Sequence, residues 1–189
     1  MKITQEFSVA LAPDDVYTFF QDVQSVSQCL PGAELTADHG DGSYEGTVSV
    51  ALGPMTATFE GRATHSADEA SRAGRISGKG VDKRGGSRGS VEVEYTVSAA
   101  EAETASTVTV DADVTLSGAA AQFGRSGLID QMSQRLIEDF VTCIEAKLAA
   151  PTAAEAGQIE AGEVRGISLF FSTLLASFKR FFKKLLGRP

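Results

Sequence analysis

The sequence of 189 residues is poor in the residue types that most often carry chemistry, with two histidines, two cysteines and no tryptophan. His39 lies in a polar turn and His65 at the end of an expected strand, and we expect both to be solvated surface side chains. Cys29 and Cys143 lie far apart and neither has a C-x-x-C partner, so the sequence supports neither a zinc knuckle nor a redox dithiol. We expect two reduced, packed thiols.

Motifs of common catalytic and nucleotide-binding sites are missing as well. No G-x-S-x-G, H-E-x-x-H or paired-thiol motif occurs. The Gly-rich stretch GKGVDKRGGSRGS at 78–90 is not a phosphate-binding Walker A loop, because it lacks the G-K-[ST] ending after four spacer residues. We interpret it either as a mobile turn with bulged strands or as a docking patch for an acidic surface, formed by Lys79, Lys83, Arg84 and Arg88.

Acidic residues are absent from the last 26 positions, which divides the chain by charge. Residues 1–163 hold 11 of the 17 basic residues and all 25 acidic ones, a net charge of −14, and residues 164–189 hold the other six cations. An acidic body argues against nucleic acid, because phosphate binding needs a basic face. The N-terminus MKITQEFSVALAP lacks the pattern of a signal peptide, so we expect a cytoplasmic protein.

Apolar and polar residues alternate in several runs between 43 and 117. In 55–65, for example, Met55, Ala57, Phe59, Gly61 and Ala63 share one face. Strict alternation with turn signals predicts an antiparallel sheet with one dry and one wet face. A strand at 3–11 and a short helix with Phe19, Phe20 and Val23 on its apolar face precede this region.

A long amphipathic helix is expected at 126–148, where apolar residues recur every three and four positions. Such a helix across a curved antiparallel sheet gives an α+β helix-grip shape. The Ala/Glu/Gly-rich stretch that follows is predicted to be a flexible linker spanning about 20 Å. We therefore expect a domain at 1–148, a linker at 149–163 and a separate amphipathic helix at 164–189.

The final segment has five phenylalanines and a wide apolar arc of roughly 160° when it is placed on a helix. Its cations interrupt the apolar run, so it cannot span a bilayer, but it fits a helix that lies in the membrane interface. The predicted membrane-binding residues are Phe170, Phe171, Leu174, Leu175, Phe178, Lys179, Arg180, Phe181, Phe182, Lys183, Lys184 and Leu185. Packing on the body, a coiled-coil dimer and a calmodulin-like partner groove are the alternatives.

Four stretches together form a recognisable pattern: CLPGAEL at 29–35, LGPMTATFEGRAT at 52–64, the Gly-rich stretch at 78–90 and LSGAAAQFGRSGLIDQMSQRLIEDFVTCIEAKL at 116–148. They resemble the CoxG family of carbon monoxide dehydrogenase accessory proteins, which belongs to the START-like (Bet v 1-like) superfamily. The loop SGAAAQFG is richer in alanine than the family pattern. The resemblance covers residues 1 to about 150. It implies a helix-grip fold with an apolar cavity between sheet and helix, and an accessory role beside a molybdenum-containing carbon monoxide dehydrogenase at the membrane.

A lipid-binding fold on a membrane helix suggests a carrier, because a long-tailed quinone stays in lipid unless an equally apolar pocket receives it. We expect menaquinone as a non-covalently bound ligand, carried between the inner face of the cytoplasmic membrane and the dehydrogenase. The candidate lining residues are Phe19, Leu30, Pro31, Met55, Phe59, Phe123, Ile129, Met132 and Leu136. A passive membrane adaptor and an assembly factor are the alternatives.

Catalysis has little support in the sequence. Cyclases of the same superfamily use sparse polar groups in the cavity, so Tyr95, Arg62 and Glu60 are candidates for an acid or base. We expect a protein that is not an enzyme and has no metal site.

Overall fold

The computed structural model describes residues 1–52, 55–100, 104–125 and 128–161 of the 189. Within them the strands are β1 Lys2–Val9, β2 Ala33–Asp38, β3 Ser43–Leu52, β4 Met55–Asp68, β5 Ala73–Asp82, β6 Ser87–Ala99 and β7 Ser106–Ser117. The helices are α1 Pro13–Gln21, α2 Val23–Gln28, α3 Leu128–Ala149 and α4 Ala153–Ala156, with the 3-10 helix η1 Gly118–Arg125 before α3.

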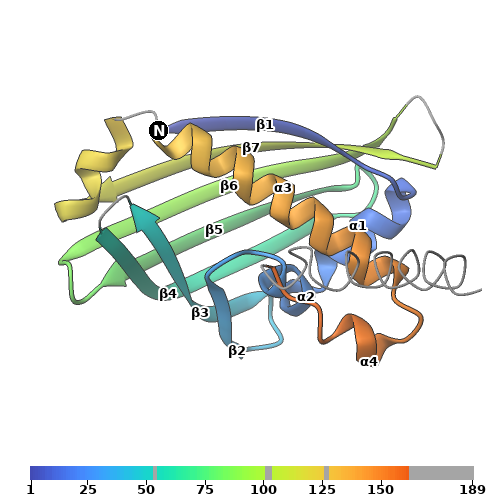
Figure 1. The fold of residues 1–189 in the computed structure, drawn as a ribbon, viewed down its shortest axis with the longest axis horizontal. Coiled ribbons are helices and arrows are strands. Elements are labelled where there is room, and N and C mark those ends of the chain that lie inside the picture. The colour runs from blue at the N-terminus through green and yellow to red at the C-terminus, as the bar shows by residue number, and fades with distance from the viewer. Residues whose placement is uncertain (53–54, 101–103, 126–127, 162–189) are drawn as a thin grey trace, which may run out of the picture.

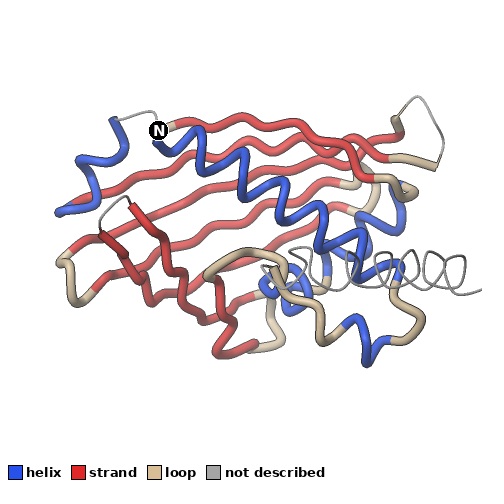
Figure 2. The backbone as a smooth tube through the Cα atoms, viewed as in Figure 1, coloured by secondary structure: helices blue, strands red, loops and turns tan. Residues whose placement is uncertain are grey.

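The strands form one curved antiparallel sheet in the order β1-β7-β6-β5-β4-β3-β2 (Figure 1). Strands β2 to β7 follow one another as a meander, and β1 closes the far edge by pairing with β7. The long helix α3 runs diagonally across one face of this sheet, and all strands lie in the layer beneath it (Figure 2). The predicted α+β helix-grip fold is therefore confirmed.

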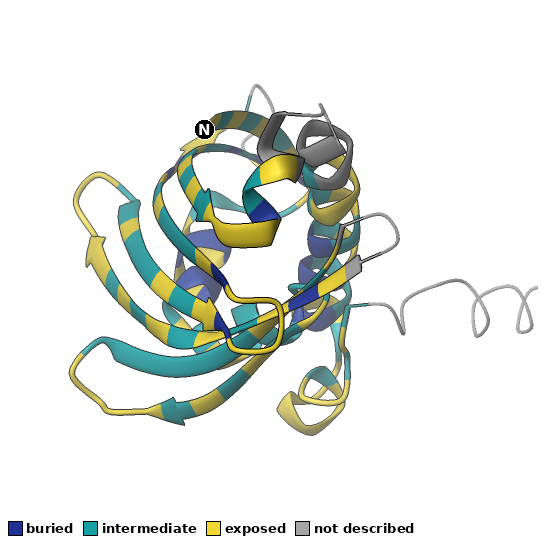
Figure 3. Ribbon diagram, turned by 90° about the vertical axis from the view of Figure 1, so that its left-hand side faces the viewer, coloured by how far each residue is buried: buried dark blue, intermediate teal, exposed yellow. Residues whose placement is uncertain are grey.

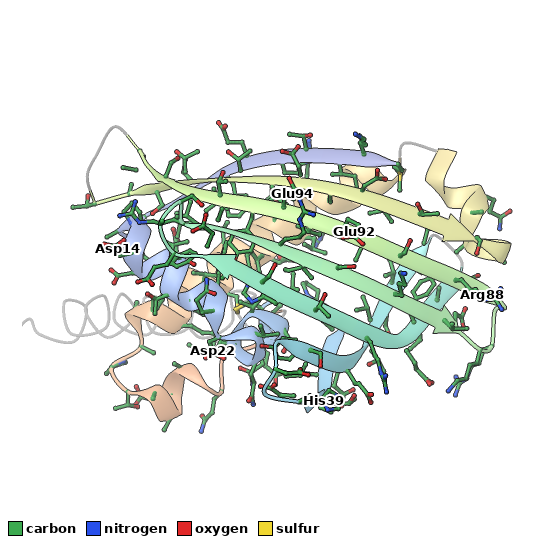
Figure 4. All side chains as sticks on the ribbon, turned by 180° about the vertical axis from the view of Figure 1, so that it is seen from behind. Asp14, Asp22, His39, Arg88, Glu92 and Glu94 are labelled. Carbon is green, nitrogen blue, oxygen red and sulfur yellow. A yellow bond between two sulfur atoms is a disulfide. The ribbon has the colours of Figure 1, made fainter. Side chains whose placement is uncertain are left out.

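Alternation along the strands gives the sheet two different faces, as expected from the period of two. Exposed residues alternate with intermediate or buried ones along most of the strands (Figure 3). Glu92 and Glu94 of β6, for example, lie on the outer face, away from α3 (Figure 4). The side chains between them, such as Val93 and Tyr95, face inward. The inner face therefore contains the apolar set that the sequence predicted.

The expected single N-terminal helix is two helices in the structure. Asp22 ends α1 and caps α2, because its side chain accepts a hydrogen bond from the Ser25 backbone N–H at 3.1 Å. Val23 therefore begins α2 and does not extend the apolar face of α1. Phe19 and Phe20 remain buried, as predicted.

The two cysteines form a disulfide, so the expectation of reduced thiols is wrong. Cys29 follows α2 directly and Cys143 lies on α3, with their Cα atoms 5.4 Å apart and both residues 0% exposed. They are 114 positions apart in the sequence, and only the packing of α2 against α3 brings them together. Spacing in the sequence carries no trace of this pairing.

The described part of the predicted linker is packed against the body and does not hang free. Lys147 on α3 is 4% exposed, and its ammonium donates to the Gln28 side-chain oxygen at 2.6 Å and to the Ala156 carbonyl at 2.9 Å. The Ala161 N–H donates to the Gln28 carbonyl, and Ile159 packs on the main core. Residues 162 and 163, and the tail from 164 onward, lie outside the described residues.

Candidate functional site

The interior has a tightly packed end, formed where α1, α2 and the C-terminal half of α3 meet the sheet. The fully or nearly buried side chains of this main core are Val9, Val16, Tyr17, Phe19, Phe20, Cys29, Tyr95, Val97, Val108, Phe140, Cys143 and Ile144. Phe20 packs edge-on against Tyr95, with ring centroids 5.0 Å apart. This end is a filled hydrophobic core held by the disulfide.

The other end of the interior is less tightly closed among the described side chains. Ala57 and Ala120 are the fully buried apolar residues of the described small cluster there, with Val50, Phe59 and Leu116 packed around them. Between the two ends, the inward-facing apolar residues keep partial solvent access along β1, β6 and β7. These residues are Ile3, Val91, Val93, Ala112 and Val114. The middle of the sheet therefore presents a continuous apolar surface that described side chains do not fully cover.

Five of the nine predicted ligand-lining residues have described side chains, and these five lie in different places in the fold. Phe19 is buried in the main core and Leu30 packs on it, whereas Phe59 belongs to the small cluster at the opposite end. Pro31 lies half-buried after α2, and Leu136 on α3 is 40% exposed. The side chains of Met55, Phe123, Ile129 and Met132 lie outside the described ones. Ligand contact by these residues stays a prediction.

A groove of about 600 Å³ lies along the edge strand β2, outside the space between sheet and α3. Its walls come from α2, β2 and the chain at Glu160 and Ala161. Glu34, Asp38 and Glu160 line it, and none of its described lining residues is basic, so this described lining is acidic. Sequence reasoning missed it because its third wall is the packed stretch that was expected to be a free linker.

An inward polar cluster joins β4, β6 and α1. His65 Nε2 and the Tyr95 hydroxyl lie 2.9 Å apart, and the Gln21 side-chain amide donates to the same hydroxyl at 3.4 Å. Tyr95 reaches His65 across β5 because Gly74 lies between them. A Cβ at Gly74 would stand 2.3 Å from the Tyr95 hydroxyl oxygen. The missing side chain therefore makes room for the tyrosine ring.

The structure corrects the expectation that His65 is a solvated surface residue. Its side chain is half-buried, and its ring is stacked against Tyr95 with centroids 6.0 Å apart. Burial lowers the pKa of His65 and raises the pKa of Tyr95, so both side chains are neutral at neutral pH. The sequence did contain one indication of this, because His65 lies an even number of positions from the inward residues Phe59 and Ala63 and therefore falls on the same face of the strand. His39 is exposed, as expected, and lies 3.5 Å from Glu45.

Of the three candidate acid or base residues, only Tyr95 faces the interior. Arg62 lies on the outer face and pairs with Glu45 at 2.7 Å, and Glu60 pairs with Lys83 on the same face. These two ion pairs are exposed and belong to the sheet's outer surface. Of these three candidates, therefore, only Tyr95, with His65 beside it, is placed as an internal acid or base.

The Gly-rich stretch forms the β5–β6 hairpin, with Arg88 near its tip (Figure 4). Its turn is held by Asp82, whose buried carboxylate accepts hydrogen bonds from the backbone N–H groups of Arg84 and Gly85, both at 3.0 Å. Lys79, Arg84 and Arg88 are exposed, and Lys83 pairs with Glu60. The cations predicted for docking thus lie together on an ordered hairpin.

The described residues contain neither a membrane-spanning helix nor a cluster of metal ligands. No helix in 1–52, 55–100, 104–125 or 128–161 is long and apolar enough to cross a membrane. In the same part of the chain, no group of three or more histidine, cysteine or acidic side chains is placed to hold a metal ion.

Solved structures with this fold share little sequence with the chain. A conserved protein from Geobacillus kaustophilus has a TM-score of 0.66 at 13% identity, covering 79% of this chain and 95% of that one. An uncharacterized protein from Bacillus thuringiensis has a TM-score of 0.54 at 11% identity, covering 76% and 98%. A norcoclaurine synthase mutant from Thalictrum flavum, bound to a transition-state analogue, has a TM-score of 0.51 at 14% identity, covering 79% and 96%. At these identities the similarity shows the fold alone.

Sequence comparisons give a family but no individual relative. The family model of CoxG, a carbon monoxide dehydrogenase component, matches residues 6–149, which is the domain from β1 to the end of α3. No curated protein matches the sequence.

Proposed function

Because this chain belongs to the CoxG family of carbon monoxide dehydrogenase components, we propose that it is a membrane-associated accessory protein of a molybdenum-containing carbon monoxide dehydrogenase. In this proposal it binds a hydrophobic quinone, menaquinone, and carries it between the membrane and the enzyme. The dehydrogenase does the chemistry, and this chain supplies no catalytic group.

The observation that carries the proposal is the partly uncovered apolar surface on the inner face of the sheet. Val93 and Ala112 are neighbours across β6 and β7, and Ile3 pairs with Ala112 from β1. All three face α3 and keep partial solvent access, whereas core residues at the α1 end are buried. Filled protein cores pack as densely as organic crystals, so an apolar surface that stays accessible inside a fold favours a ligand.

The physical problem that such a carrier solves is the insolubility of the ligand. Each CH₂ of an isoprenoid tail stabilises the membrane-bound form by about 0.8 kcal/mol, so several isoprenoid units hold the quinone in lipid. Only a protein surface that buries a similar apolar area can withdraw it. Within the described part of the fold, the inner face of β1, β6 and β7 is such an apolar surface.

We propose that residues 164–189 form the membrane-binding helix and hold the protein at the inner face of the cytoplasmic membrane. The support is the apolar arc, the six cations and the absence of acidic residues in the sequence. Phe178→Glu with Phe182→Glu should abolish sedimentation with anionic liposomes. Thr173→Glu with Ala176→Glu makes the same charge change on the opposite helix face and should weaken sedimentation less. Equal sedimentation of wild type and the first variant would contradict the membrane assignment.

The carrier is tested by mass spectrometry of an organic extract of purified protein from cells that make menaquinone. The full chain is compared with a variant ending at Ala161, because the packed stretch that closes the body reaches that residue. Removing the tail excludes quinone held in adhering membrane. We expect about one quinone per protein in both samples. An empty truncated protein that also binds no added quinone would leave a passive adaptor or an assembly factor.

A further inference from the structure

The polar cluster of His65, Tyr95 and Gln21 lies inside a fold whose inner face is otherwise mainly apolar. Tyr95 is 5% exposed and belongs to the main core, where a phenylalanine ring would pack equally well against Phe20. Placing polar groups here costs free energy unless they are hydrogen-bonded. Packing therefore explains the tyrosine ring but does not explain its hydroxyl or the imidazole beside it.

One ring nitrogen of His65 remains available to a ligand. Nε2 is engaged by the Tyr95 hydroxyl at 2.9 Å, whereas Nδ1 has no partner among the residues described here. Every fully buried side-chain nitrogen or oxygen among the described residues has a hydrogen-bond partner. Nδ1 therefore keeps some solvent access, and a ligand oxygen can replace that solvent.

We propose that His65, positioned by Tyr95, binds an oxygen of the quinone ring in both of its redox forms. This inference rests on the proposed carrier function and names the headgroup site within it. When Tyr95 donates its hydrogen to Nε2, the neutral imidazole carries its own hydrogen on Nδ1 and can donate to a quinone carbonyl. When Nε2 carries the hydrogen and donates to the Tyr95 oxygen, Nδ1 accepts from a quinol hydroxyl. Neither state changes the net charge of the site.

A carrier needs this property because it must take up one redox form and release the other. An oxidised quinone ring offers only acceptors, whereas a quinol also carries hydroxyl hydrogens, so a fixed donor would satisfy the quinone but leave the quinol hydrogen without an acceptor. Burial lowers the pKa of His65, which keeps the ring neutral and preserves its acceptor nitrogen. His65 and the small cluster at Ala57 lie eight residues apart on β4, about 26 Å of strand, and the middle of the inner face between them can take the isoprenoid chain.

The experiment uses the full chain loaded with menaquinone or menaquinol and measures three variants. Tyr95→Phe removes the hydroxyl that positions His65, His65→Phe removes the proposed contact itself, and His65→Gln restores one donor and one acceptor. We expect the dissociation constants for both redox forms to rise about 2- to 10-fold in the two phenylalanine variants, which is the range for one lost hydrogen bond. His65→Gln should recover part of the loss. Binding of squalene, an apolar probe without oxygen, should stay unchanged.

Two further measurements separate the site from the fold. His39→Gln changes the exposed histidine and should not alter quinone binding. In the infrared spectrum of bound menaquinone, the carbonyl stretch should lie lower in wild type than in His65→Phe. If wild type binds no quinone, the carrier function itself fails. If wild type binds quinone but the variants bind it equally and the stretch does not move, this headgroup site is wrong and the carrier stands.

Discussion

Removing the disulfide should destabilise the domain strongly. Cys29 and Cys143 are 114 positions apart, so the cross-link closes a long loop in the unfolded chain. In the chain-entropy estimate, a loop of this length contributes about 4.8 kcal/mol to the free energy of unfolding. For a domain of this size, that loss lowers the melting temperature by about 10–20 °C. Because both sulfurs are fully buried, the bond should persist until the domain opens.

The assay first counts thiols and then measures stability. Alkylation in denaturant followed by intact mass should find no free cysteine in untreated protein and two after reduction. Melting curves are then compared for oxidised and reduced wild type, for Cys29→Ala, for Cys143→Ala and for the double variant. If one cross-link is responsible, each single change costs nearly as much as both together. If instead the two single changes lower the melting temperature additively and reductant does not affect wild type, the two cysteines are independent packed thiols. That result would refute the reasoning.

Four more outcomes are expected. Gly74→Val should cost about 1–3 kcal/mol of unfolding free energy by denaturant titration, because its branched side chain displaces the tyrosine ring that crosses it; an unchanged midpoint would contradict that crossing. Lys147→Met should speed amide hydrogen exchange in 152–161 but not in the sheet, since it removes the hydrogen bond to the Ala156 carbonyl and the one that holds Gln28, whose carbonyl accepts from the Ala161 N–H. His65→Gln should flatten the pH dependence of the free energy of unfolding. Burial lowers the pKa of His65 in the folded protein, so in wild type this free energy falls as the pH drops below about 6.5, the pKa of the unfolded imidazole. The same dependence on pH in both proteins would argue against burial of the imidazole. Arg84→Glu with Arg88→Glu should weaken co-purification with the dehydrogenase, and unaltered complex formation would dismiss the hairpin as its docking site.

The sheet and the long helix were predictable because their signals are local. Strict alternation in 91–97 and in 108–116 specifies strands with one apolar face, and both lie within observed strands. The apolar spacing in 126–148 likewise gave α3 within two residues at its start and one at its end. Short-range periodicity is preserved in the fold because it reflects which face of an element is buried.

The site features that sequence reasoning missed depend on contacts between distant residues. The cysteine pair requires α2 to lie against α3, and the polar cluster requires a glycine on β5 beneath a tyrosine from β6. Lys147 was expected only as part of an amphipathic helix, yet its ammonium is enclosed by groups from α2 and α4. Such pairings leave no periodic trace in the sequence, so they appear only when the chain is folded.

The packed stretch at 152–161 changes how far the domain can travel from its proposed anchor. A free linker of 15 residues has an end-to-end distance of about 20 Å, so the body could lie that far from the point of attachment. With the chain pinned through Ala161, only two positions of that linker, 162 and 163, remain before the basic segment begins. In the proposed arrangement the domain would stay at the membrane surface, next to the corner built by α2, α3 and α4. The proposed partner would then have to reach it at the bilayer, because two residues give the domain almost no reach of its own.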